Sequence, residues 1–115
     1  MQFESYEDLV SWMSHKDRQA DLKSIFSYLE ECISKETNSL MQVALRRGDR
    51  SRVTKKFEQE CHEDACQHYV DEINEALRCD EPLSHWHIIS YRRKPHAWAV
   101  AKGIVEYKER IHASD

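Results

Sequence analysis

Residues 18–36 read RQADLKSIFSYLEECISKE, and this stretch decides the fold class. Its apolar side chains recur every three or four residues, so that on a helix they line one side. The charged residues between them fall on the other side. The pattern predicts an amphipathic helix over about 18–36, whose apolar stripe consists of Leu22, Ile25, Phe26, Leu29, Cys32 and Ile33.

Helical patterns also precede and follow this stretch. Ser5 and Asp8 have the spacing of an N-terminal capping pair, and the apolar positions after them predict a helix over 6–14. The polar run 37–39 offers a stop and a new N-cap. We therefore expect a separate short helix after it, which ends before Gly48.

The second half of the chain predicts two more helices and an extended segment between them. An apolar stripe runs through 51–78 with acidic residues opposite it, which indicates a long helix. Residues 85–91 are rich in β-branched and aromatic side chains, which favours a short strand or extended segment. Pro95 fits the first residue of a last helix. Gly103 weakens that helix, so a strand over 104–111 is the alternative.

Length and composition bound the class of protein. A chain of 115 residues suffices for one core, and two glycines with two prolines allow too few tight turns for an all-β sandwich. We find no apolar run of about 18 residues and no export signal, so the four cysteines are interpreted as free thiols in a cytoplasmic protein. We expect a single, mainly α domain over 1–115, with four to five helices around one core.

Charge is unevenly distributed along the chain, although the net charge is −4. Residues 46–56 hold six cations and one anion, whereas 57–81 are strongly acidic. Guanidinium and ammonium groups contact phosphates and carboxylates alike. We therefore expect 46–56 to bind nucleic acid or a protein that processes nucleic acid. The alternative is a solvated basic turn that offsets the acidic helices around it.

The same segment partly matches a helix-turn-helix motif. Ala44 and Gly48 are four residues apart, and small residues at this spacing let two helices cross closely. Asp49 and Thr54 stand where the motif usually has apolar residues. Contact with phosphates, without reading of bases, is therefore the interpretation we prefer.

A second basic stretch lies near the last predicted helix. Aromatic rings that alternate with cations can stack on bases or anchor a protein partner. We expect Trp98 to lie in the core and the residues just before Pro95 to be exposed. The candidate binding residues of the two stretches are Arg46, Arg47, Arg50, Arg52, Lys55, Lys56, Tyr91, Arg92, Arg93 and Lys94.

The histidines and cysteines of the chain make a metal site one of the alternatives. His62 and Cys66 share a helical face, His85 and His87 share a face of an extended segment, and four such ligands suffice for zinc. The alternative is that His62 and Cys66 are ordinary core residues. Cys66 with His62 as its base could also form a nucleophilic pair. The sequence has no phosphate-binding glycine loop and no nucleophile elbow, so we expect no enzyme and no cofactor.

Part of the chain resembles a known family. Residues 39–77 are similar to the helical part of Gam, the nuclease inhibitor of lambda-type phages, with small gaps on both sides of Phe57. The likeness is carried by Ser39-Leu40, Leu45-Arg46-Arg47-Gly48, Val53-Thr54, Phe57, His68 and Ile73-Asn74-Glu75. Proteins of that family are small, helical and dimeric, and they block a bacterial helicase–nuclease at its DNA-binding site. The resemblance implies an inhibitor that competes with DNA and carries over no catalytic residue.

The acidic helix face over 58–75 offers a further hypothesis. Carboxylates there can mimic a phosphate backbone and bind a protein, although such a face usually serves solubility. The carboxylates concerned are Glu60, Asp64, Asp71 and Glu75. The sequence has no sustained heptad repeat that would require a homodimer. A homodimer therefore stays one of the alternatives.

Overall fold

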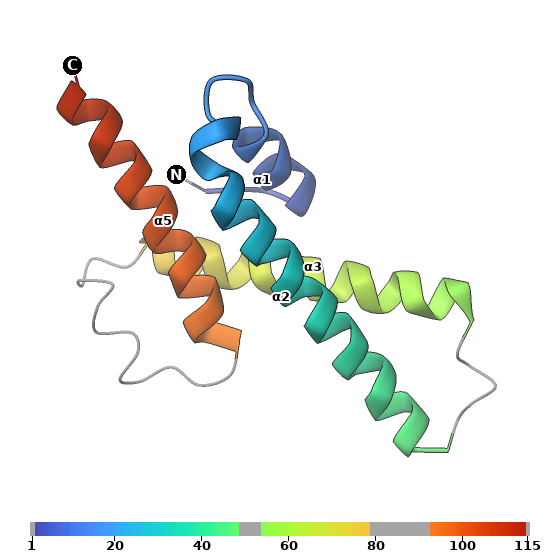
Figure 1. Cartoon of the computed structure of the whole chain (residues 1–115). Coiled ribbons are helices and arrows are strands. Elements are labelled where there is room, and N and C mark those ends of the chain that lie inside the picture. Colours follow the sequence, from blue (N-terminus) through green and yellow to red (C-terminus); the bar gives the residue numbers. More distant parts are fainter. Residues whose placement is uncertain (1, 49–53, 79–92, 115) are drawn as a thin grey trace.

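Four helices make up the computed structural model, which describes residues 2–48, 54–78 and 93–114 (Figure 1). They are α1 (Tyr6–Met13), α2 (Gln19–Arg46), α3 (Lys55–Arg78) and α5 (Arg93–Ser114). Helices α2, α3 and α5 pack against one another, and α1 packs against α2 and α3. The described residues include no strand. The predicted mainly α fold is confirmed, and the segment 85–91 lies outside the described residues.

The start of α1 follows the predicted capping pattern. Ser5 lies just before the helix with an extended backbone, and its Oγ accepts a hydrogen bond of 3.2 Å from the Asp8 backbone N–H. This bond satisfies one of the free N–H groups at the helix start. Leu9 and Met13 then lie one helical turn apart and are both buried.

Helix α2 runs through the polar residues at which we expected it to stop. Thr37 Oγ1 donates a hydrogen bond of 2.8 Å to the Ile33 carbonyl, and Ser39 Oγ donates one of 3.0 Å to the Lys35 carbonyl. Both hydroxyls thus bond within the helix instead of capping a new one. The predicted break at 37–39 and the separate short helix are therefore wrong.

The ends of the next connection are set by one glycine and one threonine. Gly48 has a φ of 80°, a left-handed conformation that glycine adopts without a Cβ penalty. Thr54 Oγ1 accepts a hydrogen bond of 3.2 Å from the Phe57 backbone N–H, so Thr54 caps α3. The predicted end before Gly48 is confirmed. The long helix begins at Lys55, and residues 51–53 of its predicted range lie outside the described residues.

Helix α5 begins at Arg93, two residues before the predicted start at Pro95, so Pro95 lies within its first turn. The helix continues through Gly103, so the alternative strand over 104–111 is wrong. A Cβ built on Gly103 would collide with Cδ1 of Ile25 on α2. At Gly103, α5 therefore lies close against the Ile25 side chain of α2. Burial of the apolar side chains around this point outweighs the low helix propensity of a single glycine, which costs about 1 kcal/mol relative to alanine.

One cluster of buried side chains draws on all four helices. Its largest fully buried members are Leu9, Met13, Leu22, Leu29, Ile33, Val70, Ile73, Val100 and Ile104. The stripe that the sequence assigned to 18–36 supplies much of the cluster, because Leu22, Leu29 and Ile33 are all buried. Trp98 is only half-buried, and the Lys102 ammonium lies 5.3 Å from the centre of its ring, so its assignment to the core is wrong.

Asn74 holds the N-terminal segment against α3. Its Oδ1 accepts a hydrogen bond of 2.9 Å from the Phe3 N–H, and its Nδ2 donates one of 2.7 Å to the Phe3 carbonyl. A single amide side chain thus satisfies both backbone groups of a residue 71 positions away. Phe3 itself is buried and stacks edge-on against Trp12.

We predict that Asn74→Ala lowers the free energy of unfolding by about 1–3 kcal/mol, because it leaves two partly buried backbone groups of Phe3 without partners. Urea denaturation followed by circular dichroism measures this change. Gln67→Ala is the matched control, since the Gln67 amide bonds Asp71 on the exposed side of the same helix. Equal effects of the two substitutions would contradict the assigned role of Asn74.

The molecule is elongated, and of the residues that the structure describes only those of α2, α3 and their flanks form one of its ends. Its extents are 56 × 34 × 22 Å and its radius of gyration is 15.9 Å, against about 13 Å for a compact chain of this length. The last turns of α2 and the first turns of α3 project away from α1 and α5 (Figure 1). We call this end, residues 40–47 and 54–64, the hairpin tip.

Candidate functional site

The hairpin tip carries four of the predicted binding residues. Arg46 and Arg47 stand at the end of α2, and Lys55 and Lys56 form the start of α3. All four side chains are exposed. None of them forms an ion pair with a carboxylate of the described residues. The tip therefore presents cationic groups that the described part of the chain leaves to solvent.

The positions of the two lysines are unfavourable for the helix itself. The first turn of a helix carries a partial positive charge, which favours acidic residues and disfavours cations. Lys55 and Lys56 occupy this turn of α3, and Glu58 offsets them only in part. Residues that oppose the stability of their own helix in this way are concentrated at functional sites. By contrast, Arg46 suits its place in the last turn of α2.

The connection between α2 and α3 does not have helix-turn-helix geometry. Helix α2 ends at Arg46 and α3 begins at Lys55, so eight residues separate them. The motif joins its helices by a turn of about 3–4 residues. The spacing of Ala44 and Gly48 therefore reflects the end of α2. Arg50 and Arg52 belong to this connection and lie outside the described residues.

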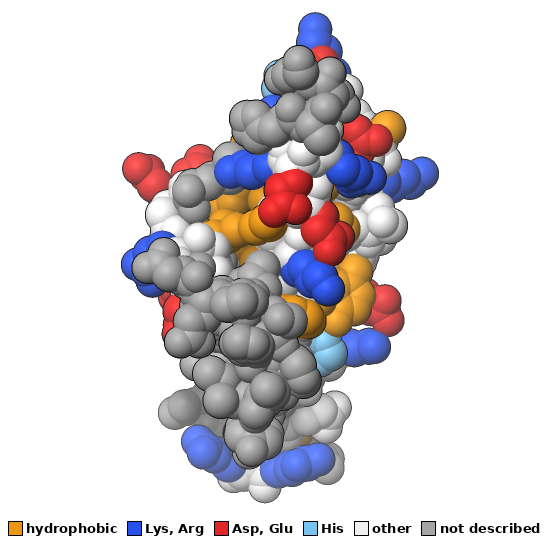
Figure 2. Space-filling view, turned by 90° about the vertical axis from the view of Figure 1, so that its left-hand side faces the viewer, with side chains coloured by type: hydrophobic (Ala, Val, Ile, Leu, Met, Phe, Trp, Pro, Cys, Tyr) orange, Lys and Arg blue, Asp and Glu red, His pale blue; other side chains and the backbone are white. Residues whose placement is uncertain are grey.

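The start of α5, which carries Arg93 and Lys94 of the second basic stretch, lies away from the tip (Figure 1). The Tyr28 hydroxyl and His96 Nδ1 are 2.6 Å apart, which places the start of α5 beside the middle of α2. Tyr91 and Arg92 lie outside the described residues, and the backbone of Arg93 and Lys94 belongs to this start of α5. On the α5 side of the molecule, basic, acidic and hydrophobic side chains are mixed (Figure 2).

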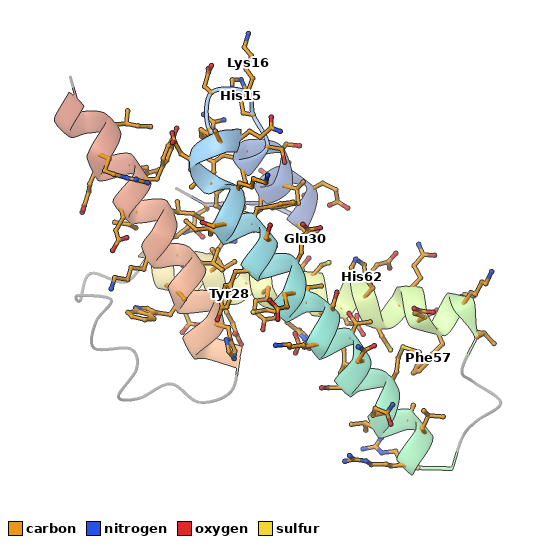
Figure 3. The ribbon with its side chains drawn as sticks, viewed as in Figure 1. His15, Lys16, Tyr28, Glu30, Phe57 and His62 are labelled. Carbon is orange, nitrogen blue, oxygen red and sulfur yellow. The ribbon has the colours of Figure 1, made fainter. Side chains whose placement is uncertain are left out.

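An apolar cleft lies between the two helices of the tip. Its volume is about 310 Å³, and it is lined by Leu40, Val43, Ala44 and Arg47 from α2 and by Phe57, Cys61 and Asp64 from α3. Phe57 points from α3 into the space between the helices (Figure 3). Val43 is 44% exposed, an unusual state for a valine on the inner side of a hairpin. Sequence reasoning missed the cleft, although Leu40, Val43, Ala44 and Arg47 have the spacing of one helical stripe.

Helix α3 carries a row of acidic residues along its exposed side. Glu60, Asp64, Asp71 and Glu75 are all exposed. Their spacing places them on one side of the helix, which spans about 22 Å between the first and the last at a rise of about 1.5 Å per residue. Asp71 accepts a hydrogen bond of 2.8 Å from the Gln67 amide, so part of this row is held in place. The predicted acidic face is therefore present.

His62 and Cys66 lie together, but they do not form an activated nucleophile. His62 Nε2 is 3.6 Å from Cys66 Sγ, and His62 is exposed whereas Cys66 is buried. Burial, with the nearby Glu7 and Glu63 carboxylates, raises the pKa of the Cys66 thiol to about 11. The thiol therefore stays protonated at neutral pH, which argues against catalysis by this pair.

The zinc hypothesis lacks a completed ligand set. In the described part of the chain no three histidines, cysteines or acidic residues stand close enough together to hold a metal ion. His85 and His87, the other two ligands of the four-ligand hypothesis, lie outside the described residues. The interpretation of His62 as a core residue is wrong, because its side chain is exposed and projects from α3 away from Phe57 (Figure 3).

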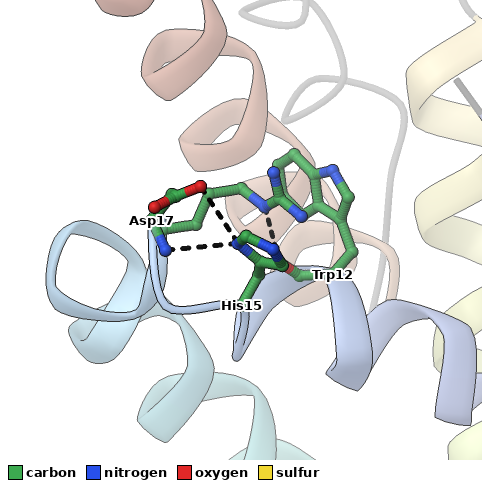
Figure 4. Close-up of polar contacts among 4 residues, drawn as sticks. Trp12, His15 and Asp17 are labelled. Atoms are coloured by element: carbon green, nitrogen blue, oxygen red, sulfur yellow. Dashed lines mark hydrogen bonds and ion pairs between the residues drawn. The ribbon is translucent and has the colours of Figure 1, made fainter.

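One cation elsewhere in the molecule, Arg18, serves the fold. In the turn between α1 and α2, Arg18 Nε donates a hydrogen bond of 2.6 Å to the Trp12 carbonyl, and its guanidinium lies 4.7 Å from the centre of the Trp12 ring (Figure 4). In the same turn His15 Nδ1 accepts a hydrogen bond of 3.2 Å from the Asp17 N–H. Arg18 is thus a structural residue, unlike the four cations of the tip.

A second cleft, of about 330 Å³, lies where α2, α3 and α5 meet. It includes Tyr28, Cys32, Tyr69 and His96. Burial raises the pKa of the Tyr28 hydroxyl, which bonds His96 across the cleft. The sequence indicated no role for this pair, because 68 residues separate its members. The bond ties α5 to α2.

Comparisons with known proteins add no assignment. No protein-family model, curated protein or solved structure matches the chain. Within the described residues, every helix is too short or too polar to span a membrane.

Proposed function

We propose that this chain is a binding protein without catalytic activity, and that it engages the phosphate backbone of nucleic acid through the hairpin tip. One observation carries the proposal: the tip gathers exposed cations without ion-pair partners among the described residues. Three of them, Arg46, Lys55 and Lys56, lie outside the lining of the apolar cleft. Arg50 and Arg52 add two more cations to the connecting segment.

The physical basis is electrostatic. Lysine and arginine side chains that neutralise phosphates release condensed counterions, and this release supplies most of the affinity of sequence-independent binding. The positive end of the α3 dipole strengthens the attraction for a phosphate at Lys55. The acidic residues of α3 begin at Glu58, within the tip, and repel phosphates, so the contact is confined to the cations at the end of α2 and at the start of α3.

We predict that Lys55→Glu/Lys56→Glu weakens binding to a fluorescent 20-base-pair DNA duplex by about ten-fold or more, because two phosphate contacts become repulsive. Fluorescence anisotropy at low salt measures the dissociation constant. Lys16→Glu/Lys23→Glu is the matched control: both lysines are exposed, lie near the α1–α2 turn and change the net charge equally. A control that weakens binding as much as the tip variant, with both variants folded by circular dichroism, would refute a localised site.

A second candidate function is supported by the acidic row on α3. Glu60, Asp64 and Asp71 form an extended anionic surface that a DNA-binding protein could accept in place of a phosphate backbone. The resemblance of 39–77 to the Gam family implies the same kind of target. Cross-linking to a captured protein distinguishes the candidates: contacts within 58–75 support the mimic, and contacts confined to 37–56 exclude it.

A further inference from the structure

A third cleft lies where the turn between α1 and α2 meets the first turns of α2, away from the hairpin tip (Figure 1). Its volume is about 360 Å³. We call it the turn cleft, and its lining consists of Met13, Ser14, Lys16, Gln19, Ala20, Lys23 and Phe26. Gly48, Thr54, Arg78 and Arg93, which flank the two internal segments outside the described residues, are not part of this lining.

The floor of the turn cleft is apolar. Met13 is buried, Phe26 is half-buried and packs against the core cluster, and Ala20 is exposed. The aromatic ring of Phe26 therefore keeps a part that a further apolar side chain can cover. The outside of a nucleic acid duplex has no such side chain to place there, whereas a peptide has.

The rim of the turn cleft is cationic. Lys16 and Lys23 are both exposed, and neither forms an ion pair with a described residue. Lys16 extends outward from the turn (Figure 3), and its flexible stem allows the ammonium group to reach a ligand. The carboxylate of the same turn, Asp17, lies 3.5 Å from His15 Nδ1 and does not line the cleft. Among the described residues, the charged groups of the lining are thus both positive.

The start of α2 adds to this positive charge. Arg18 occupies the N-cap position and forms no capping hydrogen bond with its side chain, which instead bonds the Trp12 carbonyl. The first turn of α2 therefore keeps the partial positive charge of a helix start, which attracts carboxylates. Glu30 stands one helical turn beyond Phe26 and does not line the cleft. The cationic surface is thus limited to the side of the cleft nearest the turn.

From these observations we propose that the turn cleft binds an acidic peptide segment of a partner protein. An apolar side chain of the peptide lies on the floor, and its burial supplies affinity. Neighbouring carboxylates lie beside Lys16 and Lys23 and set the orientation. The inference goes beyond the proposed function and does not depend on it. Together, the two sites would let the chain join a protein to nucleic acid.

A fluorescein-labelled peptide tests the site in the full chain. The probe has five residues, with one phenylalanine between two pairs of aspartates, and fluorescence anisotropy measures its dissociation constant. We expect saturable binding with a constant below about 1 mM. Peptides with lysines in place of the aspartates, or with glycine in place of the phenylalanine, are expected to bind about ten-fold or more weakly. Absence of saturable binding of the probe up to about 1 mM overturns the proposal.

Matched variants locate the contact. Lys16→Glu/Lys23→Glu is expected to weaken binding of the probe about ten-fold or more, and so is Ala20→Asp, which places a carboxylate on the floor. Ala20→Asp should stay folded by circular dichroism, because an acidic residue suits the first turn of a helix. Lys55→Glu/Lys56→Glu carries the same change in net charge at the tip and is expected to bind the probe within about two-fold of the wild type. Loss of probe binding in the tip variant, or unchanged binding in the Lys16→Glu/Lys23→Glu variant, overturns the proposal.

Two further measurements test whether the cleft is free for a peptide. Lys16 and Lys23 are expected to react with an amine-selective ester in the free protein and to be protected by the probe, as mass spectrometry of the labelled chain can show. Protection of both lysines without the probe would mean that another part of the chain covers the cleft, which overturns the proposal. Displacement of the probe by a 20-base-pair duplex would assign the cleft to nucleic acid and overturn it as well. Probe binding without any duplex binding would instead contradict the proposed function alone.

Discussion

Replacement of Leu29 by alanine is expected to lower the free energy of unfolding by about 2–5 kcal/mol. Leu29 has an exposed fraction of 0% and lies in the core cluster near the middle of α2. The substitution removes buried apolar atoms and leaves a cavity that close-packed neighbours fill only in part. Total stabilities of small domains are about 5–15 kcal/mol, so this single change removes a large share.

Urea denaturation at a fixed protein concentration measures the effect of Leu29→Ala. Ile111→Ala is the control, because Ile111 is 42% exposed near the end of α5. Its expected cost is below about 1 kcal/mol, in line with most surface substitutions. A cost for Leu29→Ala no larger than that of Ile111→Ala would contradict the core arrangement described above.

The second large effect is expected at Gly103. Gly103→Leu places a branched side chain where α5 meets Ile25 of α2, and overpacking of this kind costs about 1–3 kcal/mol even after the gain in helix propensity. Gly103→Ala is expected to change stability little, because the better helix propensity of alanine offsets the forced movement of the Ile25 side chain.

A double-mutant cycle isolates the contact. Ile25→Val removes Cδ1, the atom nearest to the position of a Cβ on Gly103. In this background Gly103→Ala should stabilise the protein by up to about 1 kcal/mol, the full difference in helix propensity. Additive effects of the two substitutions would show that α5 and α2 do not approach at this point.

Periodicity predicted the helices well because most apolar residues in this chain serve one core. The stripe from Leu22 to Ile33 is buried as its spacing indicated, and the Ser5 cap begins α1 as predicted. The predicted break at 37–39 was wrong because a hydroxyl side chain can form either of two local hydrogen bonds. Thr37 and Ser39 can cap a new helix or bond the carbonyl four residues back, and a single sequence does not decide between these outcomes.

The strand alternative at 104–111 arose from the low helix propensity of Gly103. Propensity describes an isolated helix, whereas here the glycine allows a close approach to Ile25 from a distant part of the chain. Long-range contacts of this kind, like the Tyr28–His96 bond, have no local signal. They explain why Gly103 and His96 could not be assigned a structural role from the sequence.

The sequence predicted the positive charge of the candidate site, but it did not predict the cleft beside it. The run from Arg46 to Lys56 identified the cationic end of the hairpin, because clustered charges are visible in any linear count. The cleft beside it was not visible, since the exposure of Val43 depends on how far α2 and α3 extend beyond α5. Its rim residues, Arg47 and Asp64, belong to segments of opposite charge that the fold brings to one surface.

The salt dependence of duplex binding by the wild-type chain tests the central claim most directly. Anisotropy titrations of a 20-base-pair duplex between about 50 and 200 mM NaCl should give a log–log slope of about −2.7 or steeper, since each phosphate contact contributes about −0.9 and Arg46, Lys55 and Lys56 supply three. Lys55→Glu/Lys56→Glu should reduce the magnitude of the slope by about 2. An affinity that stays flat across this range, or no binding at 50 mM, would contradict the assignment of the hairpin tip to nucleic acid.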